Sequence, residues 1–77
     1  MTITVKFFAG LRESLDISEV DLDPSEANNV REAWLKATQG AEMPTNTLMA
    51  INMDYVDLHH KVTDGDEVAL FPPLTGG

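Results

Sequence analysis

The sequence ends with residues 64–77, which read DGDEVALFPPLTGG. Asp64-Gly65-Asp66 is a turn signal, because glycine tolerates the positive φ that tight turns need. Glu67–Phe71 follows as an apolar strand, and Pro72-Pro73 ends it because proline cannot donate to a strand ladder. This segment therefore predicts a closing β-strand followed by an uncharged, extended tail.

The tail carries one reactive group, the α-carboxylate of Gly77. Glycine has no Cβ, so Gly76-Gly77 can enter a channel that is too narrow for any other residue. If Pro72 to Gly77 is extended, the tail reaches roughly 20 Å from the last strand. Proline at 72 and 73 favours that extension, since it fixes φ. The tail is therefore predicted to present its carboxylate inside another protein.

A terminal carboxylate has a pKa of roughly 3.3–3.7 and is ionised at neutral pH, which makes it a poor electrophile. Acyl chemistry at Gly77 therefore requires a leaving group, and adenylation with ATP is the economical route. Attack by an amine on that acyl-adenylate would make the chain a protein modifier, whereas attack by a sulfur donor would give a thiocarboxylate. The residues alone leave both outcomes open, and both assign catalysis to a partner enzyme.

The rest of the chain predicts an α+β domain with one helix packed on one sheet. Thr2 to Ala9 alternates as a strand, although Phe8 places an aromatic ring on its polar face, and Asp16 to Leu22 alternates again. The gap between these strands suggests a hairpin with a loose loop. An apolar stripe predicts a helix over residues 30–39. Short strands are expected at residues 48–51 and 55–56.

The ends of the predicted helix carry their own signals. Asn29 is a good N-cap, and Glu32 stands three residues later, as in a capping box. Gly40 is a plausible stop. Asp23-Pro24-Ser25 predicts a turn before the helix.

Composition narrows the class of protein. The 77 residues suffice for one domain, and the chain has no cysteine, which excludes disulfides and fits a reducing cytosol. A formal charge of −8 disfavours nucleic acids and anionic membranes as partners. No apolar run approaches the roughly 20 residues of a membrane span. The N-terminus starts directly on a strand-like pattern, without a signal peptide. We therefore expect a cytoplasmic domain.

Other candidate sites in the sequence are weak. His59 and His60 are adjacent and point in opposite directions on a strand, so we expect exposed loop residues rather than metal ligands. Met43, Met49 and Met53 fit core or loop positions. The tail is left as the candidate site.

Three segments resemble one known family: residues 7–13 (FFAGLRE), Ile51-Asn52, and residues 64–77. They are similar to the small subunit of molybdopterin synthase, the MoaD-type sulfur carrier of the MoaD/ThiS ubiquitin-like family. The resemblance spans the whole chain, and its last fourteen residues are the most specific part. It implies a β-grasp, ubiquitin-like fold with a mixed sheet and one main helix on one face. It also implies a single domain over residues 1–77 with a flexible tail at 72–77.

The resemblance further implies a reaction cycle in which this chain is a carrier rather than a catalyst. An E1-like enzyme uses ATP to adenylate Gly77, and a sulfur donor such as a cysteine desulfurase system converts it to a thiocarboxylate. The tail then enters the large subunit of the synthase, where sulfur passes to cyclic pyranopterin monophosphate to form molybdopterin. The assembled synthase is a heterotetramer. The chain itself binds no permanent cofactor or metal.

Residue roles follow from position in the matching segments. Gly77 carries the acyl group, and Gly76 is narrow enough to pass through the partner's tunnel. Phe71 belongs to a docking patch, with Leu11 and with Phe8, for which simple burial is an equal alternative. Arg12 pairs with a partner carboxylate or is a solvated loop residue. The partner's tunnel is lined by the preceding tail residues, Pro72, Pro73, Leu74 and Thr75. Leu70 and Leu74 depart from the aromatic residue and valine that many relatives have there, but keep the apolar character.

Three alternatives share the fold or the terminal glycines. A thiamine-pathway sulfur carrier uses the same terminal chemistry, but typically lacks the Phe-Pro-Pro-x-Thr element. A ubiquitin-like modifier would instead be joined to lysines. A passive binding module would have an inert tail.

Overall fold

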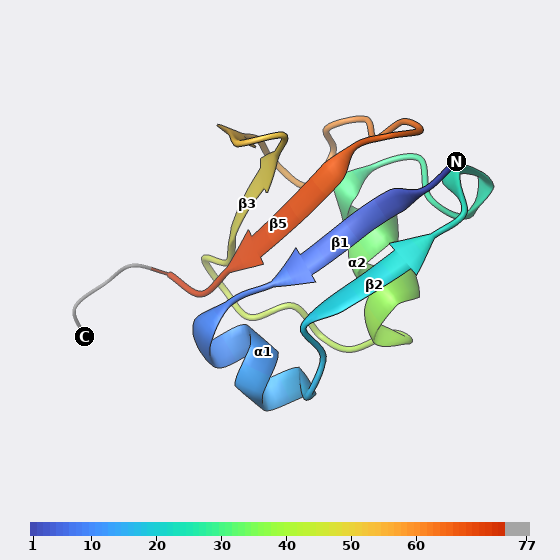
Figure 1. Cartoon of the computed structure of the whole chain (residues 1–77). Helices are drawn as coiled ribbons and strands as arrows, with labels where there is room; N and C mark the ends of the chain where they lie inside the picture. Colours follow the sequence, from blue (N-terminus) through green and yellow to red (C-terminus); the bar gives the residue numbers. More distant parts are fainter. Residues whose placement is uncertain (74–77) are drawn as a thin grey trace.

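The computed structural model describes residues 1–73, and Leu74–Gly77 lie outside the described residues. Figure 1 shows one mixed sheet with helices to one side and at one end. The elements, in chain order, are β1 (Ile3–Phe7), α1 (Ala9–Leu15), β2 (Glu19–Leu22), a 3₁₀ turn (Pro24–Glu26), α2 (Val30–Thr38), β3 (Leu48–Ile51), β4 (Asp54–Tyr55) and β5 (Glu67–Phe71).

The sheet order is β2-β1-β5-β3-β4. Within residues 1–73, only β1 and β5 pair in parallel; β1 with β2, β3 with β5 and β3 with β4 are antiparallel. The predicted mixed sheet is confirmed. β5, the last strand in the sequence, therefore lies in the middle of the sheet, between the first strand and β3.

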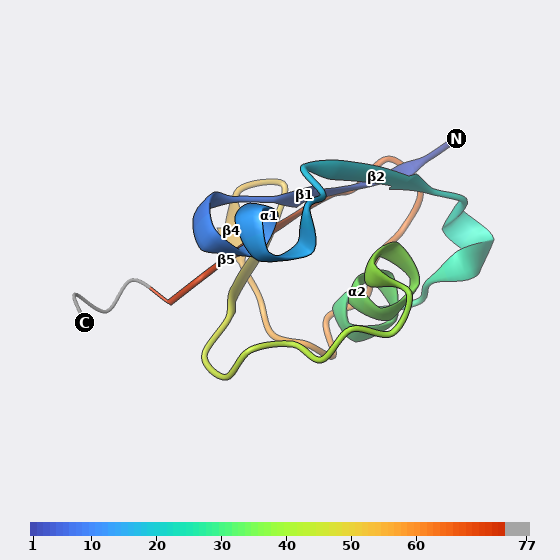
Figure 2. The same cartoon turned by 90° about the horizontal axis from the view of Figure 1, so that it is seen from below.

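The core lies between one face of the sheet and α2, which covers that face (Figure 2). Alternate residues of the two central strands point into it, because side chains alternate along a strand. Trp34 of α2 is 2% exposed, meets Phe7 edge-on with ring centroids 5.8 Å apart, and donates its indole N–H to the Ala41 carbonyl. The most deeply buried side chains on the strands are Ile3, Val5, Phe7, Val68 and Leu70.

Helix α2 begins and ends close to the predicted residues. The Asn29 side chain accepts a hydrogen bond from the backbone N–H of Glu32 at 2.8 Å, so the predicted N-cap is confirmed. The Glu32 carboxylate accepts from the N–H of Asn28, one residue before the cap. Gln39 adopts the left-handed conformation, and Gly40 (φ +90°) donates to the Leu35 carbonyl, which satisfies a helix-end acceptor.

The turn predicted at Asp23-Pro24-Ser25 is confirmed and has the form of a 3₁₀ turn. The Asp23 carboxylate accepts hydrogen bonds from the Ser25 hydroxyl at 2.7 Å and from its backbone N–H at 2.9 Å. These two bonds stabilise the charged form and lower the pKa of Asp23. The Glu26 side chain accepts from the Asp23 N–H in return.

The loose loop expected between the first two strands is wrong, because residues 9–15 form helix α1. The helix has seven residues, too few for a repeating apolar stripe to be recognisable in the sequence. Leu11 is its one buried residue, at 4% exposure, and Leu15 packs against the same core from the next turn. Leu11 therefore belongs to the core, and its predicted place in a docking patch is wrong.

A hydrogen-bonded brace joins the β3–β4 turn to the start of β5. The Asn52 side chain donates to the Asp66 carboxylate and accepts from the Glu67 N–H, both at 3.0 Å, while the Asn52 N–H donates to the Glu67 carbonyl. Asp66 also accepts from the N–H and hydroxyl of Thr63. Gly65, with φ +90°, makes the predicted turn. The brace fixes the register between β3 and β5.

Replacing Leu11 with alanine tests the assignment of this residue to the core. We expect Leu11→Ala to lower the free energy of unfolding by about 2–4 kcal/mol, because it leaves a cavity under α1. Urea unfolding followed by circular dichroism measures the change. Arg12→Ala, on the exposed side of the same helix, is the matched control and should stay within about 0.5 kcal/mol of the wild type. Equal, small effects of the two substitutions on the free energy of unfolding would contradict the assignment of Leu11 to the core.

Candidate functional site

The described residues of the predicted site are Phe8, Leu11 and Arg12 near the start of the chain, and Phe71, Pro72 and Pro73 at the start of the tail. The other predicted site residues, Leu74, Thr75, Gly76 and Gly77, lie outside the described residues. Phe71 ends β5, and Pro72 and Pro73 continue from it, half-buried and outside any strand. Because β5 is central, the chain leaves the sheet from its middle, at the end where α1 lies (Figure 1).

The face of the sheet opposite α2 is free of helices among residues 1–73 (Figure 2). Directly opposed residues of neighbouring strands share a face. The pairings Lys6–Ala69, Ala69–Ala50 and Ala50–Tyr55 therefore form one row across this face. Glu19 extends the row on the β2 side, because it pairs with Lys6. The side chains of this row are charged at one end, small in the middle and aromatic at the other end.

The two alanines form the floor of a hollow of about 260 Å³. Ala50 is 5% exposed although it belongs to the open face, because the hollow that it lines is surrounded by larger side chains such as Tyr55 and Phe71. We call this feature the apolar hollow. Its lining residues are Phe8, Ala50, Met53, Tyr55, Glu67, Ala69 and Phe71.

Phe8 and Phe71 form one wall of the apolar hollow as a stacked pair. Their ring centroids are 4.9 Å apart and the ring planes differ by 12°. Phe8 remains 37% exposed, so it contributes to the surface as well as to packing. Its N–H donates to the Leu70 carbonyl at 3.1 Å, which ties the start of α1 to β5. The pairing brings together the two aromatic residues that the sequence assigned to a docking patch.

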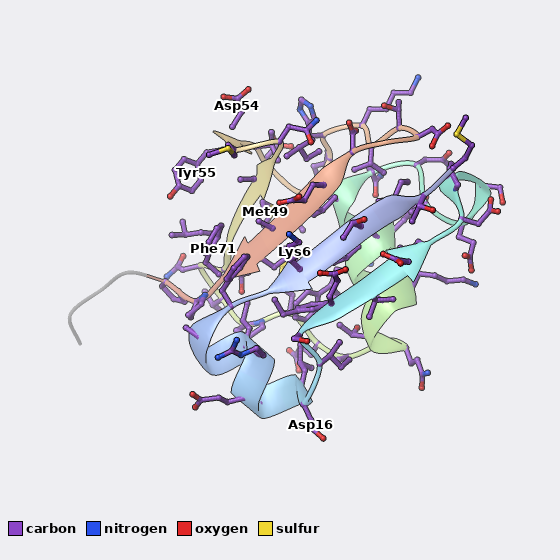
Figure 3. All side chains as sticks on the ribbon, in the orientation of Figure 1. Lys6, Asp16, Met49, Asp54, Tyr55 and Phe71 are labelled. Carbon is purple, nitrogen blue, oxygen red and sulfur yellow. The ribbon has the colours of Figure 1, made fainter. Side chains whose placement is uncertain are left out.

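Two further residues line the apolar hollow that the sequence did not predict as site residues. Tyr55 is 70% exposed and Met53 is 92% exposed, so both present large apolar surfaces to solvent. Figure 3 shows Tyr55 and Phe71 at the same end of the sheet, on β4 and β5. Strand β4 has two residues, which is too short for a clear pattern in the sequence. Tyr55 lies beside the hollow because it pairs with Ala50 across the two strands.

Charged side chains lie beside the apolar hollow. The Lys6 ammonium is 3.5 Å from the Glu67 carboxylate, and both side chains are substantially exposed, so this ion pair contributes little to stability. Arg12 is exposed on α1. Its exposure fits both the partner contact and the solvated residue that the sequence left open.

A larger cavity of about 430 Å³ lies beside the β3–β4 turn, with His60, Lys61 and Asp66 in its lining. The Asp66 carboxylate already accepts hydrogen bonds from Asn52 and Thr63. We therefore assign this residue of the cavity to the brace between the β3–β4 turn and β5. His59 and His60 are exposed, as predicted. No group of three or more potential metal ligands occurs within residues 1–73. In the same part of the chain, every helix is too short or too polar to span a bilayer.

These features define a small ubiquitin-like domain with an apolar face next to its C-terminal strand, and comparisons with known proteins place it in a family. The sequence profile of the ThiS family matches residues 5–77. The molybdopterin synthase sulfur carrier subunit of Escherichia coli is 38% identical, with 97% of this chain and 99% of that protein covered. The chain belongs to the ThiS family, and the predicted relationship to molybdopterin synthase sulfur carriers is confirmed.

Solved structures confirm the β-grasp, ubiquitin-like fold. SAMP1 from Haloferax volcanii superposes with a TM-score of 0.77 over 100% of both chains, at 27% identity. A chain of the complex between subunits 1 and 2 of molybdopterin-converting factor from Helicobacter pylori superposes with a TM-score of 0.68 over 100% of both chains, at 25% identity. The fold is thus shared by proteins with different names and roles.

The stacked wall of the hollow can be tested by a double-mutant cycle. We expect Phe8→Leu and Phe71→Leu to be coupled by about 0.5–1.5 kcal/mol in the free energy of unfolding, because each leucine keeps apolar bulk but removes the ring stack. Thermal or urea unfolding of the single and double variants gives the coupling. Phe8→Leu combined with Arg31→Ala, on the far side of the sheet, should be additive. Additivity of the phenylalanine pair would contradict the stack.

Proposed function

We propose that this protein is the sulfur carrier subunit of a molybdopterin synthase. The observation that carries the proposal is the end-to-end similarity to the Escherichia coli sulfur carrier subunit, at 38% identity. It is supported by the apolar hollow, which lies where the chain leaves β5 toward the terminal Gly76-Gly77. The hollow docks the partner, and the tail delivers the sulfur.

The chemistry takes place at the carboxylate of Gly77. An E1-like enzyme forms the acyl-adenylate from ATP, releasing pyrophosphate. The terminal sulfur of a persulfide, supplied by a donor such as a cysteine desulfurase system, then attacks the acyl carbon and displaces AMP. A thiol cleaves the sulfur–sulfur bond, which leaves the thiocarboxylate on Gly77 and a disulfide between the thiol and the donor sulfur. In the large subunit the thiocarboxylate sulfur bonds to cyclic pyranopterin monophosphate, and water cleaves the acyl–sulfur bond and regenerates the Gly77 carboxylate. The general acids and bases for these steps belong to the partners.

Docking and delivery are linked by the position of β5. Phe71 is held by its stack with Phe8 and by its pairing with Leu48, so the start of the tail is fixed relative to the apolar hollow. Six residues, 72–77, reach roughly 20 Å when extended. A partner seated on the hollow can therefore hold its active site about that far away. The slim Gly76-Gly77 then occupies the narrowest part of its tunnel, after Thr75 and Leu74.

The partner of this proposal is the large synthase subunit, and the assembly is a heterotetramer in the cytoplasm. The Helicobacter pylori relative was solved as a complex of subunits 1 and 2 of molybdopterin-converting factor. An apolar hollow of about 260 Å³ suits one large apolar side chain at the centre of such an interface.

Removing the last two residues tests the carrier mechanism. Deletion of Gly76-Gly77 should abolish sulfur transfer while leaving the fold and binding to the large subunit intact, because the hollow is untouched. Intact-mass analysis after incubation with ATP, the activating enzyme and a sulfur source should show a gain of about 16 mass units in the wild type, since sulfur replaces oxygen at a carboxylate. Sulfur transfer by the truncated protein would overturn the mechanism.

Filling the hollow tests the docking role separately. Ala69→Leu should weaken binding to the large subunit by about tenfold or more, because the added side chain occupies the space of the partner's residue. Isothermal titration calorimetry measures the affinity. Thr4→Leu makes a similar addition on the polar part of the same face and serves as the control. Unchanged affinity of the Ala69→Leu variant would place docking elsewhere.

A second candidate is a ubiquitin-like modifier, which the similarity to SAMP1, the small archaeal modifier protein 1, favours. In that case the activated Gly77 would be attacked by lysine amines. Denaturing gels of cell extract, developed with an antibody to this protein, separate the two roles. Ladders that survive reductant support the modifier, and a single band of the free protein supports the carrier. Sulfur transfer only to a thiazole-forming enzyme would instead support a thiamine-pathway carrier.

A further inference from the structure

The turn between β3 and β4 holds a methionine in a conformation that normally favours glycine. Asn52 and Met53 are its two central residues and have φ of +50° and +76°. Ile51 and Asp54 pair directly across it, so it is a two-residue hairpin turn with both central residues at positive φ. Asparagine-glycine is the preferred sequence for such a turn, and Met53 stands where glycine is expected. Methionine is strained there, because its Cβ crowds the backbone.

The strain is not offset by packing within residues 1–73. Met53 is 92% exposed, so its side chain contributes little to the core. It also lines the apolar hollow, on the rim next to Tyr55. A strained backbone that displays an apolar side chain at a surface hollow is a combination typical of functional positions. Its stabilising contacts are therefore expected in a complex rather than in the free domain.

The chain contains four methionines, and their environments differ sharply. Met49 is 7% exposed in the core, and Met43 is half-buried against it. Met1 is exposed but lies at the N-terminus, at the opposite end of β1 from α1 (Figure 1), and it is not among the lining residues of the apolar hollow. Met53 is thus the one methionine that is both accessible to solution oxidants and part of the hollow.

We propose that Met53 is a redox-sensitive docking residue, whose oxidation by peroxides releases the partner from the apolar hollow. A lone pair of the thioether sulfur attacks one peroxide oxygen, the O–O bond breaks, and the products are the sulfoxide and water. The sulfur is oxidised and the peroxide reduced. The sulfoxide is polar, so its burial in the interface is unfavourable without a new hydrogen bond. This inference rests on the proposed docking of the large subunit at the hollow.

The first experiment compares binding before and after oxidation. The full chain is treated with dilute hydrogen peroxide, and peptide mass spectrometry locates the added oxygen. We expect oxidation at Met53 and Met1, with Met49 protected, and a loss of affinity for the large subunit of about tenfold or more. Methionine sulfoxide reductases should restore the affinity, because sulfoxide formation is reversible. Unchanged affinity with Met53 fully oxidised would overturn the inference.

Matched variants separate oxidation of Met53 from other effects of peroxide. Met53→Leu keeps the apolar bulk but has no sulfur to oxidise, so the affinity of this variant, whatever its value before treatment, should be unchanged by peroxide even though Met1 still oxidises. Met53→Gln imitates the polarity of the sulfoxide and should bind about tenfold more weakly without any oxidant. Equal peroxide sensitivity of the Met53→Leu variant and the wild type would overturn the role of Met53.

The strain is tested by Met53→Gly. We expect this variant to raise the midpoint of thermal unfolding by about 4 °C, because glycine accepts the positive φ, and yet to weaken docking. A variant that binds as tightly as the wild type would show that the methionine side chain has no part in docking. Failure of the untreated wild type to bind the large subunit would instead refute the proposed function, so the two failures are distinguishable.

Discussion

The parallel pairing of β1 with β5 is the interaction on which the rest of the structure depends. It inserts the last strand between the first strand and β3, so both sides of β5 are hydrogen-bonded and its register is fixed. The inward residues of the two strands, Val5 and Val68 among them, are fully buried against α2. The chain therefore leaves a rigid, central strand rather than a frayed edge. A tail that must reach a distant active site reproducibly requires such a fixed point.

The same pairing determines what the open face presents. With one helix layer and one sheet, residues 1–73 cover one face of the sheet with helices and leave the other face open. The register aligns Ala69 with Ala50 and thereby creates the low floor of the apolar hollow. Phe8 and Phe71 then stand at one side of it. The apolar hollow thus arises from the alignment of small residues with small residues, beside the end of β5.

The sequence predicted β5, α2 and the turn at Gly65 because each carries a strong local signal: an apolar run ended by two prolines, an apolar stripe with an N-cap, and a glycine between two aspartates. It failed on α1, whose seven residues bury a single leucine, and so it assigned Leu11 to the surface. It placed Phe71 and Phe8 in the candidate site, and the structure stacks their rings beside the apolar hollow, but it did not point to Tyr55 and Met53. Their membership of the site depends on strand register and turn geometry, which involve residues far apart in the chain.

The charge of the protein opposes association between copies through the exposed aromatic surface. Exposed apolar patches promote association between copies of a chain. Here the formal charge of −8 makes two copies repel each other, and carboxylates such as Glu67 and Glu19 lie on the same face as the apolar hollow. A partner with an apolar anchor and a basic rim meets no such repulsion. Charge and hydrophobicity together therefore favour docking of a different protein over self-association.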